Sequence, residues 1–286
     1  MALRSSALVL LLYTVCSFLS TTRVHAFSAP RRPATTLRRD PIGRITQLDR
    51  SKIDPSSDAN FYARPNLVTH ADEQFIAQVT NLYNDVFLSS SSAAAAAMMN
   101  NNSNNHCKSE GLIVLDIMSS HVSHIPAGAP LARLDVHGMN GQELEVNPAR
   151  RQTNGAMMLR NLNDNPSFLG LAETAVYDLV LCCCSVQYLQ EPEQVFAEVG
   201  RLLKPGGTVV VTFTNRFFPQ KALNGWIERA MKERARLVTD YLRAAGGFVD
   251  IQVLGDGTSP LTQLWSVGGL GGDPFVAVVG TRDDSP

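Results

Sequence analysis

Hydrophobic positions after residue 110 alternate between continuous apolar runs and stripes of helical period. GLIVLD (111–116), YDLVLCCC (177–184) and TVVVTFT (208–214) are apolar almost throughout, which is typical of strands buried on both faces of a sheet. LARLDVHG (131–138) and GAMMLR (155–160) show the same character more weakly. The pattern therefore predicts five strands between residues 111 and 214.

Helical stripes separate and follow these strands. From Val195 to Leu203 the apolar residues fall at offsets 0, 1, 4, 7 and 8, and Pro205-Gly206-Gly207 is expected to close that helix. A second stripe predicts one long helix from about 219 to 245, ended by Gly246-Gly247.

Two further strands are predicted at 248–254 and 275–281, joined by a Gly-rich connection. Strands alternating with helices predict an α/β fold, in which a mostly parallel sheet is covered by helices on both faces. Ligands of such doubly wound sheets bind beyond the carboxyl ends of the strands.

Residues 46–110 form an expected N-terminal extension before this domain, which is expected over 111–282. An apolar stripe from Phe75 to Phe87 predicts a helix, and Thr69 with Asp72 three residues later has the spacing of a capping box. The low-complexity stretch at 89–105 has no periodicity and predicts a disordered loop, its alanines extending the helix by a turn at most.

The first 45 residues have the pattern of a targeting leader. Arg4 precedes an apolar run of 13 residues, and Val24-His25-Ala26 is a small-residue cleavage site, so residues 1–26 are typical of a signal peptide. Residues 27–45 are rich in Arg, Ser, Thr and Pro, as transit peptides are. The combination resembles the bipartite plastid-targeting leaders of algae with secondary plastids, where a Phe follows the cleavage point, as Phe27 does here. A secreted protein with a basic, disordered start is the alternative.

The distribution of charge argues against one class of partner. The formal net charge is −1, but residues 1–45 hold 7 of the 25 basic residues and one acid, which leaves 18 basic against 25 acidic side chains. Phosphate contacts need a clustered positive surface, so no nucleic-acid partner is expected. The apolar run of 13 is too short for a permanent membrane anchor. The sequence indicates no oligomeric state.

Five cysteines predict neither a metal site nor a disulfide framework. Cys16 lies in the leader, and Cys182, Cys183 and Cys184 are consecutive. Adjacent strand residues point to opposite faces, so the triplet is expected to pack as small apolar side chains rather than to share one ion.

The block from Tyr177 to Arg216, YDLVLCCCSVQYLQEPEQVFAEVGRLLKPGGTVVVTFTNR, resembles the fourth strand, helix and fifth strand of class I S-adenosylmethionine-dependent methyltransferases of the type 11 kind. Asp178 and Leu203-Lys204-Pro205-Gly206-Gly207 match the landmarks of that family. LDIMSSHVSHIP (115–126) and HGMNGQEL (137–144) are more loosely similar to a plastid-directed subset of methyltransferase-like proteins. The resemblance implies a seven-stranded Rossmann-like sheet with a C-terminal antiparallel hairpin.

The resemblance also implies a cofactor site at the strand ends, with two departures. An acid ends the first strand, as in the family, but Met118, Ser120 and Val122 stand where the family has three glycines. Gly138 stands where the family has the acid that binds the cofactor's ribose, and Asn140 or His137 is the uncharged substitute. The residues expected around S-adenosylmethionine are Asp116, Met118, Ser119, Ser120, Gly138, Asn140, Asn161, Leu162 and Ser185.

His121 and Tyr188 are the candidate catalytic residues. A histidine with an ordinary pKa near neutrality is suited to act as a general base, whereas Tyr188 follows the fourth strand, where the family places groups that touch cofactor or acceptor. Capping of the next helix is the alternative for His121 and the preferred role for His124. Asp116 is equally suited to cap the turn after its strand, and Arg216 either pairs an anionic substrate or a surface carboxylate.

Three functions from different classes are compatible with these residues. The first is a plastid methyltransferase acting on a small-molecule acceptor. The second is a binding or structural protein that has kept the fold and lost cofactor binding. This alternative is favoured by the absence of the three glycines and of the acid that binds the ribose. The third, a nicotinamide oxidoreductase, lacks the Gly-x-Gly-x-x-Gly sequence after the first strand.

Overall fold

The computed structural model of the chain describes residues 49–100, 111–255 and 272–284. The expected signal peptide, the transit-like segment and most of the Gly-rich connection lie outside the described residues. All described residues belong to one compact unit that spans Asp40–Pro286. Among them, no helix is long and apolar enough to cross a membrane.

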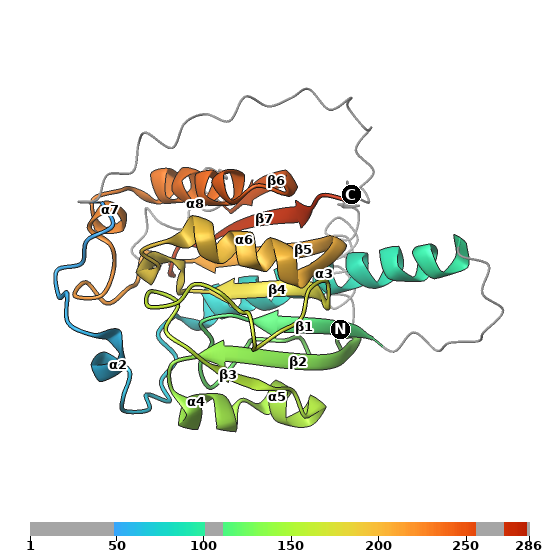
Figure 1. Cartoon of the computed structure of the whole chain (residues 1–286), viewed down its shortest axis with the longest axis horizontal. Coiled ribbons are helices and arrows are strands. Elements are labelled where there is room, and N and C mark those ends of the chain that lie inside the picture. The colour runs from blue at the N-terminus through green and yellow to red at the C-terminus, as the bar shows by residue number, and fades with distance from the viewer. Residues whose placement is uncertain (1–48, 101–110, 256–271, 285–286) are drawn as a thin grey trace, which may run out of the picture. The chain divides into compact units, whose positions relative to one another are not determined.

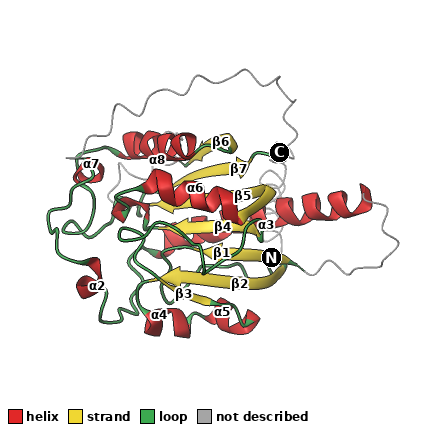
Figure 2. Cartoon of the chain, viewed as in Figure 1, coloured by secondary structure: helices red, strands yellow, loops and turns green. Residues whose placement is uncertain are grey.

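A seven-stranded sheet in the order β3-β2-β1-β4-β5-β7-β6 organises the fold. The pairs from β3 through β5 are parallel, whereas β7 runs antiparallel to both β5 and β6. This topology confirms the expected doubly wound sheet with its C-terminal antiparallel hairpin (Figure 2). The strands are β1 (Leu112–Asp116), β2 (Leu131–Gly138), β3 (Met157–Leu159), β4 (Tyr177–Cys183), β5 (Leu203–Phe213), β6 (Phe248–Leu254) and β7 (Val276–Arg282).

Helices cover the two faces of the sheet, as Figure 1 shows. On one face Val199 of α6 and Val238 of α8 are fully buried in the larger hydrophobic cluster, and on the other Val79 and Tyr83 of α3 are fully buried against β1 and β2. The predicted N-terminal extension therefore contributes a layer of the fold itself. The helices are α2 (Asp58–Phe61), α3 (Glu73–Asn100), α4 (Gly141–Val146), α5 (Pro148–Thr153), α6 (Pro192–Leu202), α7 (Asn224–Ile227) and α8 (Met231–Ala245), with a 3-10 turn η1 (Val186–Tyr188).

Helix α3 begins and ends later than predicted. Its first turn is capped by Asp72 rather than Thr69, because the Asp72 carboxylate accepts the Phe75 N–H at 2.8 Å. It continues to Asn100, so the loop expected from residue 89 is wrong for 89–100. Alanine has the best helix propensity, and the hydroxyls of Ser91 and Ser92 bond to carbonyls one turn back. The helix thereby accommodates a run that has no apolar stripe.

The long helix predicted over 219–245 is two helices, α7 and α8. The break is stabilised from both sides, since the Glu233 carboxylate accepts the Ala230 N–H at 3.0 Å and the Arg234 guanidinium donates to the Trp226 carbonyl at 3.0 Å. These bonds satisfy backbone groups that a continuous helix would pair internally. Only α8 ends as predicted, at Gly246 and Gly247, which both have positive φ.

The Lys204-Pro205-Gly206-Gly207 segment is the first part of β5 and not a turn outside it. Gly206 has a φ of +74°, and a Cβ on Gly207 would lie 2.8 Å from the Lys204 carbonyl oxygen. The glycines therefore allow the chain to leave α6 and enter the sheet directly. The third strand is also shorter than expected, covering three residues.

Candidate functional site

The carboxyl ends of the parallel strands open on one cavity of about 990 Å³. Segments after β1, β2, β3, β4 and β5 line it, together with the N-terminal segment from Asp58 to Phe75. Every residue that the sequence predicted for the site lines this cavity: Asp116, Met118, Ser119, Ser120, His121, Gly138, Asn140, Asn161, Leu162, Ser185 and Tyr188. The structure therefore brings all of these residues together around one cavity at the strand ends.

Asp116, at the end of β1, is held by the turn that follows it. The residue is 3% exposed, and its carboxylate accepts a hydrogen bond from the Ser119 hydroxyl at 2.6 Å. Burial raises the pKa of the Asp116 carboxyl to about 7, against the hydrogen bonds of Ser119 and Ser123, which lower it. The role of capping the turn is thus observed, and it fixes the loop that forms the cavity floor.

His137 ties the ends of three strands together. Its Nδ1 accepts the Met118 N–H at 3.2 Å, so the neutral ring carries its proton on Nε2, which donates to the Arg160 carbonyl at 3.0 Å. The His137 carbonyl in turn accepts the Ser119 N–H at 2.7 Å. Burial lowers the pKa of His137 to about 4, which keeps the ring neutral. With both nitrogens occupied, His137 positions the loop and is not free to replace the ribose-binding acid.

One of the three positions expected to need glycine has the backbone geometry that favours it. Met118 has a φ of 54°, in the left-handed region, whereas Ser120 and Val122 do not have positive φ. Gly138 is glycine for a different reason: a Cβ there would lie 2.7 Å from the Ser119 carbonyl oxygen and 3.2 Å from Leu144. The close approach of the β1 loop therefore excludes an acid at the end of β2.

Three predicted polar ligands already have partners within the protein. The Asn140 side chain caps α4 by accepting from Gln142 and Glu143, and it donates to the Tyr62 carbonyl at 2.9 Å. Asn161 accepts from the Asn163 N–H and donates to Asp164, and Ser185 Oγ lies 3.3 Å from Cys182 Sγ. These side chains shape the cavity wall. Leu162 is 3% exposed and belongs to the hydrophobic core.

Glu143, in the first turn of α4, is a cavity residue that the sequence analysis missed. One carboxylate oxygen accepts the Ser120 hydroxyl at 2.6 Å and the other accepts the Asn66 N–H at 2.7 Å. The signal was present in HGMNGQEL, where Glu143 follows the cap residue Asn140 by three positions. That spacing is typical of a helix start, which directs the Glu143 side chain back toward the strand ends.

His121 is oriented by the same carboxylate through a hydroxyl. Ser120 Oγ lies 3.2 Å from His121 Nδ1. Because the single Ser120 proton goes to Glu143, His121 Nδ1 is the donor in this contact, and Nε2 of the neutral ring keeps its lone pair. Residues 117–130 contain no helix, so the expectation that His121 or His124 caps one is wrong. His124 has a φ of 51°, and burial lowers its pKa.

Aromatic rings form another wall of the cavity. Tyr188 stacks on Phe218 with ring centroids 6.2 Å apart, and Phe61 and His70 contact the same ring edge-on at 5.3 and 5.1 Å. The Tyr188 hydroxyl accepts the Phe218 N–H at 3.0 Å. Burial raises the pKa of Tyr188 to about 12, so its phenol remains protonated at neutral pH.

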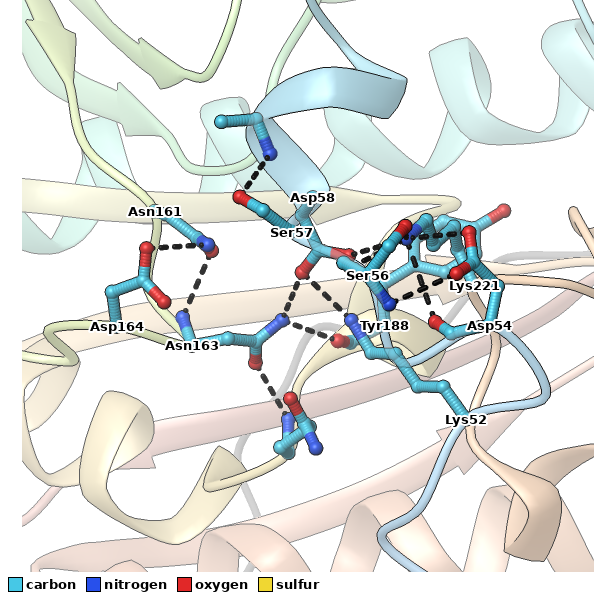
Figure 3. A network of polar contacts seen from close by, with 12 residues as sticks. Lys52, Asp54, Ser56, Ser57, Asp58, Asn161, Asn163, Asp164, Tyr188 and Lys221 are labelled. Carbon is cyan, nitrogen blue, oxygen red and sulfur yellow. Dashed lines mark hydrogen bonds and ion pairs between the residues drawn. The ribbon is translucent and has the colours of Figure 1, made fainter.

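A network of buried charges holds the N-terminal segment against the site (Figure 3). Asp58 accepts from Lys52 at 2.8 Å and from Asn163 at 2.9 Å, and it lies 3.6 Å from the fully buried ammonium of Lys221. Asn163 also donates to the Tyr188 carbonyl at 3.0 Å. The segments after β3 and β4 are thus bound to α2, and no periodicity in the sequence indicated this.

The structure shows the partner of Arg216 at the rim of the cavity. Arg216 pairs with Asp273 at 2.6 Å, so its partner is a carboxylate of the protein, as the second alternative expected, but this carboxylate is buried and not on the surface. Asp273 and Asp72 are joined by reciprocal bonds between carboxylate and backbone N–H, which fasten the start of α3 to the same place.

Cys182 is buried, whereas Cys183 and Cys184 both line the cavity, because the φ of 51° at Cys184 breaks the alternation of a strand. The expectation that adjacent members face opposite sides is therefore wrong for that pair.

Comparison with known proteins finds a family match for about a third of the chain. Residues 119–211 match the family model described as a methyltransferase domain. A search of curated proteins found no match.

Solved structures with a similar chain path include three methyltransferases. An S-adenosylmethionine-dependent methyltransferase from Mesorhizobium loti is 15% identical over 60% of this chain and 91% of its own, with a TM-score of 0.39. One from Listeria monocytogenes is 12% identical over 60% and 90%, with a TM-score of 0.41. Phosphoethanolamine N-methyltransferase 2 from Haemonchus contortus is 13% identical over 60% of this chain, with a TM-score of 0.38, and the aligned region spans about half (49%) of its length. Residues 119–211 therefore match the methyltransferase-domain family model, in agreement with the resemblance to class I S-adenosylmethionine-dependent methyltransferases.

Proposed function

We propose that this protein is an S-adenosylmethionine-dependent methyltransferase that acts on a small-molecule acceptor in the plastid. The observation that carries the proposal is that the turn after β1 and the ends of β2, β3 and β4 meet at one cavity within a segment of the methyltransferase-domain family. Ligand cavities of about 300–1,000 Å³ enclose small molecules. A volume of about 990 Å³ therefore accommodates a cofactor together with a small acceptor.

The residues present fit the cofactor. Asp116, Met118 and Ser119 form a turn fixed by His137, and the absence of a side chain at Gly138 lets this turn approach the end of β2 closely. Asn161 and Leu162 follow β3 on the same wall. The bound group supplies a methyl carbon already activated by its sulfonium, so the protein's task is alignment of the acceptor and exclusion of water.

The other residues of the site have distinct roles in the proposed reaction. Nε2 of His121 accepts the proton of an acceptor that is protonated when it binds, with the ring held by Ser120. The protonated phenol of Tyr188 and the ring of Phe218 enclose the acceptor and exclude water. No covalent enzyme intermediate is required.

Transfer of label tests this function. The purified protein is incubated with methyl-tritiated S-adenosylmethionine and the small-molecule fraction of isolated plastids. Label recovered in a low-molecular-weight product supports the proposal, whereas label found only in protein or nucleic acid contradicts the acceptor class. A fluorescent fusion of residues 1–45 tests the compartment: accumulation in the plastid supports it, and secretion contradicts it.

A non-catalytic methyltransferase-like protein is the second candidate. It is favoured by the side chain at Met118, where the left-handed φ of 54° suits glycine, and by the absence of an acid at Gly138. Under this alternative the folded protein binds no S-adenosylhomocysteine. If replacing both Met118 and Ser120 by glycine created an affinity that the parent lacks, the alternative would be established.

A further inference from the structure

The Glu143 carboxylate has acceptor capacity that the described residues do not use. A carboxylate offers about four acceptor sites, and two are filled, by Ser120 Oγ at 2.6 Å and by the Asn66 N–H at 2.7 Å. Glu143 is half-buried and lines the cavity. The remaining lone pairs of both oxygens are therefore available to a molecule bound there.

No ion pair neutralises this carboxylate among the described residues. Three arginines line the cavity: Arg160 donates to the Ser167 carbonyl, Arg216 pairs with Asp273, and Arg64 forms no ion pair with any described residue, Glu143 included. Asp58, another carboxylate of the wall, is instead bonded to Lys52 and lies 3.6 Å from Lys221. Within the described part of the chain, Glu143 is thus a charged acceptor bonded to neutral donors alone, and such a group forms strong hydrogen bonds with ligand hydroxyls.

The position of Glu143 is fixed between the ends of β1 and β2. Ser120 belongs to the loop after β1, and the next residue of the helix, Leu144, packs against Gly138 at the end of β2. Gly138 cannot carry an acid, because its Cβ would lie 2.7 Å from the Ser119 carbonyl oxygen. The first turn of α4 therefore holds a carboxylate five residues after Gly138, at the place in the chain where the end of β2 carries none.

We propose that Glu143 binds the ribose of S-adenosylmethionine and accepts hydrogen bonds from both of its hydroxyls. The inference rests on the proposed function. A carboxylate with one open acceptor site on each oxygen matches a pair of vicinal hydroxyls, and the ribose carries the cofactor's only such pair. The cofactor site thus extends beyond the end of β2 to a helix residue that also anchors Asn66 of the N-terminal segment.

A purely structural role for Glu143 makes a different prediction. If Glu143 only anchors Asn66, then Glu143→Gln lowers the affinity for every ligand of the cavity by a similar factor. If Glu143 binds the ribose, the loss depends on whether the ligand has ribose hydroxyls. The comparison of two ligands in two proteins separates these roles.

The experiment measures binding of S-adenosylhomocysteine and of its 2′-deoxy analogue by calorimetry to the wild type, to Glu143→Gln and to Glu145→Gln. Glu145 lies on the same helix, is exposed and does not line the cavity, so it is the matched control. A hydrogen bond to a charged group changes affinity by about 10- to 100-fold. We expect the wild type and Glu145→Gln to prefer S-adenosylhomocysteine by about that factor, and Glu143→Gln to lose most of the preference.

Each outcome decides a separate point. A folded wild type that binds neither ligand overturns the proposed function, and this inference with it. A wild type that binds both ligands equally overturns the inference alone and needs no variant. If Glu143→Gln keeps the preference for S-adenosylhomocysteine over the 2′-deoxy analogue, the inference is also overturned. If Glu143→Gln loses this preference and Glu145→Gln keeps it, the inference is supported.

Discussion

The backbone N–H of Met118 donates a hydrogen bond to Nδ1 of His137 across 3.2 Å. This bond joins the loop after β1 to the end of β2, and the other ring nitrogen of His137 reaches the chain after β3. The neutral tautomer is required, since a protonated ring cannot accept from Met118. One buried histidine thereby fixes the floor of the proposed cofactor site.

The pH dependence of stability follows from His137 and its neighbour Asp116. Burial lowers the pKa of His137 from 6.5 to about 4, so its stabilisation is present above pH 6.5 and is lost as the pH falls toward 4. Burial raises the pKa of Asp116 from 3.8 to about 7, so its stabilisation is present at low pH and is lost as the pH rises through that window. The two contributions oppose each other between about pH 4.5 and 6.5.

We therefore expect Asp116→Asn to steepen the pH profile. Relative to the wild type, its free energy of unfolding should rise by about 2 to 3 kcal/mol from pH 4.5 to 6.5, because the opposing carboxyl is gone. Urea unfolding at the two pH values measures this, with the exposed Asp164→Asn as control. Parallel profiles for Asp116→Asn and the wild type would contradict the assignment.

Restoring an acid at the end of β2 is expected to fail. In Gly138→Asp the new Cβ would lie 2.7 Å from the Ser119 carbonyl oxygen, so the β1 loop must shift. The expected loss is at least about 2 kcal/mol of stability, without a gain in affinity for S-adenosylhomocysteine. Gly141→Ala is the control, since its Cβ would meet only the Leu159 side chain at 3.4 Å. A stable Gly138→Asp that binds more tightly refutes the packing argument.

The buried ammonium of Lys221 is expected to be essential for attachment of the N-terminal segment. Lys221→Met removes this cation from Asp58 and Asp54. Because Asp58 keeps its ion pair with Lys52 and Asp54 is partly exposed, the expected loss is about 3 kcal/mol, the lower end of the range for breaking a buried pair. Arg243→Ala removes an exposed pair with Asp240 and should change stability by about 1 kcal/mol or less. Chemical denaturation compares the two, and equal effects would mean that the network is not a buried support.

His121→Gln is expected to lower the rate of methyl transfer by about 100-fold or more, because a general base contributes that much when the acceptor must lose a proton. Its affinity for S-adenosylhomocysteine should remain within a few-fold of the wild type. His124→Gln, on the same loop, serves as the comparison in the tritium-transfer assay. A larger loss of rate in His124→Gln than in His121→Gln would show that His124 is the base and would contradict the assignment to His121.

Strand positions were predictable because runs such as Leu112–Asp116 and Tyr177–Cys183 are buried on both faces, and burial imposes an apolar pattern. The place of the cavity at the strand ends followed from the topology of the sheet. Glu143, Asp58 and the bonds of His137 were not predictable, because they depend on polar contacts between segments far apart in sequence. The break between α7 and α8 was missed because it arises from side chain to backbone bonds that leave the apolar stripe intact.

Binding of S-adenosylhomocysteine to the purified wild-type protein, measured by isothermal titration calorimetry, tests the central claim most directly. We predict one site with micromolar affinity and a matching rise in melting temperature, because a ligand specific for the folded state stabilises it. A folded sample that shows neither heat of binding nor stabilisation at millimolar ligand would contradict the account and leave a methyltransferase fold without its cofactor.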